Sequence, residues 1–100
     1  MTQLSESVTL ERDDDVALIV IDNPPVNALS QHVRAGLLAG LEAAADSDAM
    51  AVVVICTGRT FIAGADITEF GEAPKRPSLQ QVQDAMENCP KAVVAAIHGT

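Results

Sequence analysis

The chain has 100 residues, which is enough for one small domain and too few for two. Hydrophobic residues make up 48% of the sequence and charged residues 20%, so the chain can bury a core and lacks the composition of a disordered segment. The net charge of −8 argues against nucleic acid or an anionic membrane as the main partner, because both attract surplus basic charge.

The cysteines and the apolar runs indicate the cellular compartment. Cys56 and Cys89 have no ligand-like spacing to each other or to a histidine, and Cys56 ends an apolar run, which favours a buried, reduced thiol. The first residues lack the basic stretch and apolar core of a secretory signal. Apolar runs such as 49–56 fall far short of the roughly 20 residues that cross a bilayer. We therefore expect a cytoplasmic protein without membrane insertion.

The N-terminal part of the sequence predicts a β-hairpin. Residues 7–12 alternate in the manner of a half-exposed strand, and residues 16–21 form a continuous apolar run that is typical of a strand covered on both faces. The acidic triplet 13–15 between them is compatible with a metal site or with a solvated turn, and the turn is the commoner use of such a triplet.

A helix is predicted after the hairpin. The prolines in residues 22–27 interrupt regular structure, and Ser30 can then cap a helix that runs to Ala45. Its apolar stripe consists of Val33, Leu37, Leu41 and either Ala44 or Ala45. His32 and Arg34 lie in the first turn beside this stripe, and we expect His32 to be a surface residue.

The C-terminal part alternates strand and helix. A second buried strand is predicted at 51–56, a loop at 57–71, a helix from Ser78 to Glu87 and a third buried strand at 92–97. Buried strands separated by helices require crossover connections, which predicts an α/β fold in which these strands are parallel.

The loop after residue 56 is the candidate site. Ala63, Gly64 and Ala65 have almost no side-chain bulk, so a ligand can approach the backbone. Asp66 and Glu69 favour a helical turn beginning here, because acidic groups complement the helix dipole, and an N–H group at a helix start suits a developing oxyanion. The alternative is an ordinary strand-to-helix connection that uses glycine for a tight turn.

Three segments resemble the crotonase (enoyl-CoA hydratase/isomerase) superfamily, in the family's order and spacing. They read NPPVNALS at 23–30, FIAGADITEF at 61–70 and AAIHG at 95–99. The resemblance implies an α/β fold of crotonase-like ββα repeats, of which residues 1–100 are the N-terminal half, truncated after Thr100. The first segment is particularly similar to the hydratase part of multifunctional fatty-acid oxidation enzymes.

This resemblance implies an enoyl-CoA hydratase of fatty-acid β-oxidation that binds an acyl-CoA thioester. The backbone N–H of Ala65 corresponds to the first oxyanion-hole donor. Ala63 and its neighbour Gly64 correspond to the residues that receive the CoA adenine, and Asp66 and Ile67 shape the pocket. The resemblance implies no metal and no cofactor, since coenzyme A is part of the substrate. It also implies either a homo-oligomer or a dehydrogenase domain further along the chain.

Other functions remain open at this point. The family places its second oxyanion donor and its catalytic glutamates beyond Thr100, so we expect the 100 residues alone to lack appreciable hydratase activity. A Δ3,Δ2-enoyl-CoA isomerase of the same family is an alternative, as is a catalytically silent interaction module with an exposed strand edge. A dinucleotide-binding domain is disfavoured, because residues 23–25 stand where its glycine-rich fingerprint would be.

Overall fold

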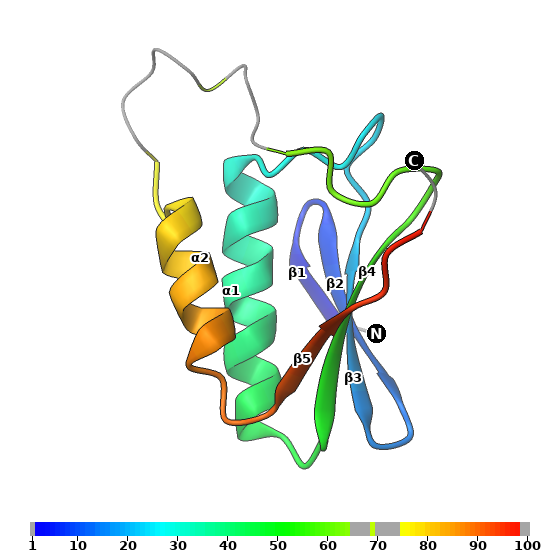
Figure 1. The fold of residues 1–100 in the computed structure, drawn as a ribbon, viewed down its shortest axis with the longest axis vertical. Helices are drawn as coiled ribbons and strands as arrows, with labels where there is room; N and C mark the ends of the chain where they lie inside the picture. The colour runs from blue at the N-terminus through cyan, green and yellow to red at the C-terminus, as the bar shows by residue number, and fades with distance from the viewer. Residues whose placement is uncertain (1, 65–68, 70–74, 99–100) are drawn as a thin grey trace.

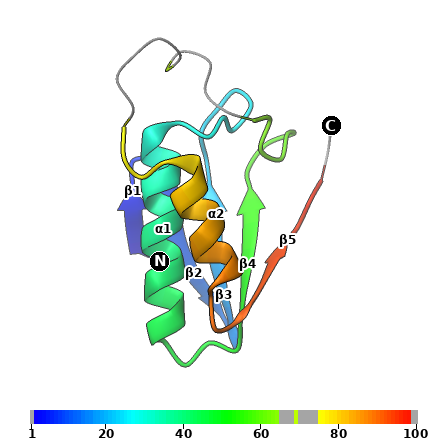
Figure 2. The same cartoon turned by 60° about the vertical axis from the view of Figure 1, so that its left-hand side comes forward.

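Two helices cover one face of a five-stranded sheet in the computed structural model, which describes residues 2–64, 69 and 75–98 (Figure 1). The elements in chain order are β1 (Thr2–Ser5), β2 (Val8–Asp13), β3 (Val16–Ile21), α1 (Gln31–Asp46), β4 (Ala51–Cys56), α2 (Leu79–Glu87) and β5 (Ala92–Ala95). Turning the molecule keeps both helices on the same side of the strands (Figure 2). The predicted α/β class is therefore confirmed.

The sheet is mixed, with strand order β1-β2-β3-β4-β5. The first three strands are antiparallel neighbours, and β3, β4 and β5 are parallel, as the hairpin and the crossovers predicted. Asp14 and Asp15 form the turn between β2 and β3, which confirms the turn reading of the acidic triplet. Because Ile21 pairs with Cys56, strands β3 and β4 end at the same edge of the sheet.

The core lies between the helices and one face of the sheet. Alternate residues of β3 and β4 are buried there, namely Ala17, Ile19, Ile21, Val52, Val54 and Cys56. The prediction of strands covered on both faces was wrong, because residues on the opposite face, such as Leu18 and Val53, are only half-buried. The predicted helical stripe of α1 is confirmed by the burial of Val33, Leu37, Leu41 and Ala44.

The strands at the two edges of the sheet differ from expectation. The prediction of a third buried strand was wrong, because β5 lies at an edge and Val94 within it is 52% exposed. Strand β1 was not predicted at all, since Thr2, Gln3 and Ser5 are polar and give no strand pattern. It forms because the backbone N–H and C=O groups of β2 hydrogen-bond to those of β1. The two strands are antiparallel, and Thr2 pairs with Leu10.

Both helices begin directly after the predicted serines, but the predicted cap at Ser30 was wrong in one respect, because its side chain accepts no N–H of α1. Ser78 caps α2 through a capping box, in which its hydroxyl accepts the Gln81 N–H and the Gln81 side chain accepts the Ser78 N–H. His32 in α1 is not a free surface residue, because its two ring nitrogens lie 2.6 Å from Ser7 Oγ and 3.1 Å from Ser30 Oγ. In the part of the chain that the structure describes, neither helix is long and apolar enough to cross a bilayer.

Candidate functional site

The candidate site is formed by two loops that leave the same edge of the sheet, residues 22–30 after β3 and residues 57–64 after β4 (top of Figure 1). In open α/β sheets, ligands bind beyond the carboxyl ends of the parallel strands. The sequence predicted the second loop as the site. The register between Ile21 and Cys56 brings the first loop against it, which local patterns did not indicate.

Asn27 joins the two loops. Its side-chain nitrogen donates to the carbonyls of Thr57 at 3.0 Å and Thr60 at 2.7 Å, and its side-chain oxygen accepts the Asn23 N–H at 2.8 Å. The residue is 3% exposed and has a φ of 54°, a left-handed conformation that asparagine tolerates better than most residues. Asn27 therefore fixes the path of residues 57–60 through hydrogen bonds that only an amide can make together.

The backbone of Ala63 and Gly64 is held in place and remains approachable. The Ala63 N–H donates to the Val26 carbonyl at 3.1 Å, and the Gly64 carbonyl accepts the Leu29 N–H at 2.8 Å. Ala63 is exposed, and a Cβ built on Gly64 would meet no atom of the described residues within 4 Å. Gly64 has a φ of 138°, in the region that favours glycine. A ligand can therefore reach this backbone without displacing any side chain that the structure describes.

The predicted site residues are only partly within the described chain. Ala63 and Gly64 lie on the approachable backbone, whereas Ala65, Asp66 and Ile67 lie outside the described residues. The roles of all five stay predictions. Within residues 2–64, 69 and 75–98, no three carboxylate, imidazole or thiol groups gather closely enough to hold a metal ion.

Glu69 and Arg34 form an ion pair next to this site. Arg34 Nη2 lies 3.1 Å from Glu69 Oε1, and Glu69 Oε2 accepts the Gln31 N–H at 2.8 Å. Arg34 lies beside the apolar stripe as predicted, but it is only 8% exposed and is part of the interior. Sequence analysis missed this pairing, because it joins residues far apart in the chain and the segment between them contains no signal of their contact.

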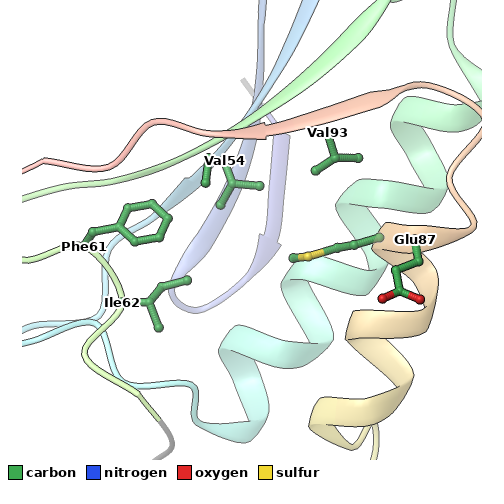
Figure 3. A pocket seen from close by; sticks show the side chains of 7 residues that line it. Val54, Phe61, Ile62, Glu87 and Val93 are labelled. Atoms are coloured by element: carbon green, nitrogen blue, oxygen red, sulfur yellow. The ribbon is translucent and has the colours of Figure 1, made fainter.

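An apolar cleft of about 340 Å³ lies beside the loop, between the sheet and α2. Figure 3 shows Phe61 and Ile62 of the loop on one side of it, and Val54 and Val93 of the sheet above. Its remaining lining residues are Met86, Glu87 and Ala95. Glu87 is exposed, so the described side chains inside the cleft are apolar.

The reactivity of the Cys56 thiol reports whether the chain is folded where β4 ends and the loop begins. Burial raises the pKa of its thiol, and a hydrogen bond with the Ile62 backbone lowers it to a lesser extent. We expect iodoacetamide at pH 8 to alkylate the half-buried Cys89 and to leave Cys56 unmodified, because the thiolate is the reactive form. Peptide mass spectrometry would measure both sites, with a urea-unfolded sample as the control for equal reagent access.

The contribution of the Cys56 thiol to the free energy of unfolding decreases as the pH rises. Because the folded-state pKa of Cys56 is raised, its contribution to stability is present below the ordinary thiol pKa and is lost as the pH rises toward the folded value. Raising the pH above about 9 is therefore expected to lower the free energy of unfolding and to increase the alkylation of Cys56. Alkylation of Cys56 as fast as Cys89 in the native protein at pH 8 would contradict its burial.

Comparison with known proteins gives the family. Residues 11–100 match the family described as enoyl-CoA hydratase/isomerase. The chain is 48% identical over 86 residues to the peroxisomal bifunctional enzyme of Danio rerio, and 37% identical over 101 residues to a probable enoyl-CoA hydratase of Bacillus subtilis. These alignments cover 84% and 93% of this chain, but the chain spans only 12% and 39% of the length of those relatives.

The comparison of folds agrees with this family match. The crystal structure of enoyl-CoA hydratase from Thermoplasma volcanium superimposes with a TM-score of 0.81 at 26% sequence identity, covering 95% of this chain and 41% of that one. The crotonase-type fold that the three sequence segments implied is thereby confirmed. The chain belongs to the enoyl-CoA hydratase/isomerase family.

Proposed function

We propose that this chain forms the thioester-binding part of an enoyl-CoA hydratase that acts in fatty-acid β-oxidation. The observation that carries the proposal is the approachable backbone at Ala63 and Gly64, fixed beyond the carboxyl ends of two parallel strands. Membership of the family supplies the class of substrate. The names of the Danio rerio and Bacillus subtilis relatives support the choice of hydratase.

In the proposed reaction, water adds across the double bond between C2 and C3 of the acyl group. The oxygen of water bonds to C3, a proton goes to C2, and negative charge develops on the thioester oxygen in between. The N–H of Ala65 donates to that oxygen, where a fixed donor lowers the barrier because it binds the transition state more strongly than the substrate. The acid–base groups come from residues that the family places after position 100.

We also propose that this hydratase part is joined to a dehydrogenase domain in the full protein. The identity with the peroxisomal bifunctional enzyme of Danio rerio supports this arrangement, since it is higher than the identity with the Bacillus subtilis protein. The same sequence segment, NPPVNALS at 23–30, forms the loop that Asn27 ties to the candidate site.

The proposal predicts that the chain binds butyryl-CoA, a saturated thioester that cannot be hydrated. Isothermal titration calorimetry should detect binding that Gly64→Ala weakens about tenfold, which is the loss of about one good contact. Its Cβ would project into the open space where the ligand is placed. Crotonyl-CoA should not be hydrated appreciably by these 100 residues alone.

Gly58→Ala is the matched control. Gly58 also has a positive φ, 78° against 138° for Gly64, and a Cβ there also meets no described atom within 4 Å, so this substitution strains a loop backbone without entering the candidate site. We expect this variant to bind butyryl-CoA with nearly unchanged affinity. Equal weakening by both substitutions would mean that strain, and not occupation of the site, causes the effect. Failure of the unsubstituted chain to bind butyryl-CoA would refute the proposed function.

A further inference from the structure

Arg34, in the first turn of α1, holds two separate points of the segment that leads from β4 to α2. One point is Glu69, whose Oε1 lies 3.1 Å from Arg34 Nη2. The other is the stretch just before α2, where Arg34 donates to the carbonyls of Lys75 at 3.3 Å and Pro77 at 2.7 Å. A fourth bond goes to the Leu29 carbonyl at 2.7 Å. The fixed fork of a guanidinium group is suited to holding several acceptors at once.

Glu69 connects this arginine to the start of α1. The N–H of Gln31, an orphan donor in the first turn of α1, is satisfied by Glu69 Oε2 at 2.8 Å. A carboxylate at this end of a helix is also favoured by the helix dipole. Both oxygens of Glu69 are therefore engaged, one by charge and one by the helix backbone.

The proposed substrate-binding loop thus has an anchor on each side of Ala65. On the near side, the Gly64 carbonyl accepts the Leu29 N–H at 2.8 Å. On the far side, Glu69 is held by Arg34 and Gln31. Only four residues, 65–68, connect the two anchors. Both anchors are fixed by one short stretch of the chain, residues 29–34.

We propose that Arg34 and Glu69 are positioning residues for the acyl-CoA site, which fix the chain at Glu69, on the far side of the predicted oxyanion donor from the Gly64 anchor. This inference rests on the proposed function. Neither residue is assigned a contact with the substrate. Preorganisation of this kind improves affinity because less conformational freedom is lost on binding.

The size of the effect follows from the length of chain between anchors. Without the Glu69 anchor, the next described residue downstream that Arg34 holds is Lys75, so the connecting stretch lengthens from four residues (65–68) to ten (65–74). The probability of keeping two chain points together falls as about the 3/2 power of the length between them. Butyryl-CoA binding is therefore expected to weaken about fourfold.

Glu69→Gln is the test, because it removes the charge and keeps the shape of the side chain. Calorimetry should show a Kd for butyryl-CoA about fourfold higher at unchanged stoichiometry. A merely structural role would instead reduce the fraction of competent protein and leave the Kd unchanged. Backbone amide NMR gives an independent readout, since the Ala65 amide signal should shift on addition of butyryl-CoA and should shift less in the variant.

Two further variants complete the experiment. Glu42→Gln makes the same chemical change at an exposed position of α1 and should leave the Kd unchanged. Arg34→Lys retains a positive charge for Glu69 but loses the fork that also holds the Lys75 and Pro77 carbonyls, so its Kd should likewise be raised above that of the unsubstituted chain, and it serves as the readout if Glu69→Gln fails to fold.

The outcomes separate this inference from the proposed function. If the unsubstituted chain binds butyryl-CoA and both Glu69→Gln and Arg34→Lys bind it equally well, the positioning role is overturned and the proposed function stands. If the unsubstituted chain does not bind butyryl-CoA, the proposed function fails and the positioning role fails with it.

Discussion

Replacement of Asn27 by aspartate is expected to destabilise the protein by about 3 kcal/mol or more at pH 7. Aspartate has the same shape as asparagine and also tolerates the φ of 54°. The substitution therefore changes only the hydrogen-bonding groups and the charge of the side chain. The amide nitrogen that donates to the Thr57 and Thr60 carbonyls becomes a carboxylate oxygen, which faces both carbonyls at about the same short distances. Asn27 is 3% exposed, so water cannot screen the resulting repulsion. Urea unfolding followed by circular dichroism would measure the loss.

The pH dependence of this variant distinguishes electrostatics from loss of packing. A carboxyl group forced against carbonyl oxygens has a raised pKa in the folded state, so its penalty grows as the pH rises above the ordinary aspartate value of about 3.9. The deficit relative to the unsubstituted chain should therefore shrink between pH 7 and pH 4. The same amide-to-acid change at the exposed Gln83 should alter stability by less than about 0.5 kcal/mol. A deficit independent of pH would contradict the proposed repulsion.

Much of the fold could be predicted because its signals are local. The apolar run 16–21 became β3 with the expected bounds, as did 51–56 for β4. The N-cap positions Ser30 and Ser78 were identified from residue type and from the periodic stripe that follows each of them. These features depend on neighbours within about one helical turn or on alternation along one strand. The candidate loop was also found locally, from the run of small residues at 63–65.

What could not be predicted depends on partners distant in the sequence. β1 exists because β2 provides backbone groups for it, and β5 is exposed because it lies at an edge of the sheet. The burial of Arg34 follows from carbonyls more than forty positions away, at Lys75 and Pro77. Polar residues have no periodicity that reveals such contacts. Local patterns therefore indicated the candidate loop, whereas the contacts that hold its described residues were visible only in the structure.

Replacement of Gly36 by alanine is expected to destabilise the protein by about 1–3 kcal/mol. In a free helix the same change stabilises by roughly 0.5–1 kcal/mol, because alanine loses less backbone entropy. Here a Cβ would lie 2.4 Å from Val8 Cβ and 2.6 Å from Val8 Cγ2, in a core where Val8 is 0% exposed. Val8 Cβ is bonded directly to the backbone, so relief requires moving strand β2 away from α1. The free-energy cost of relieving this steric clash therefore exceeds the gain in helix propensity.

Gly40 provides the matched control one turn further along the same helix. A Cβ there would lie 3.0 Å from the terminal carbons of Ile19 and Leu4, and these ends of flexible side chains can shift by a few tenths of an ångström. Gly40→Ala should therefore retain part of the propensity gain and be the more stable variant in urea unfolding. Adding Val8→Ala to Gly36→Ala should not restore stability, because the closest atom, the β-carbon, remains. Equal stability of the two glycine variants would show that α1 and β2 can separate without cost, contrary to the close packing described.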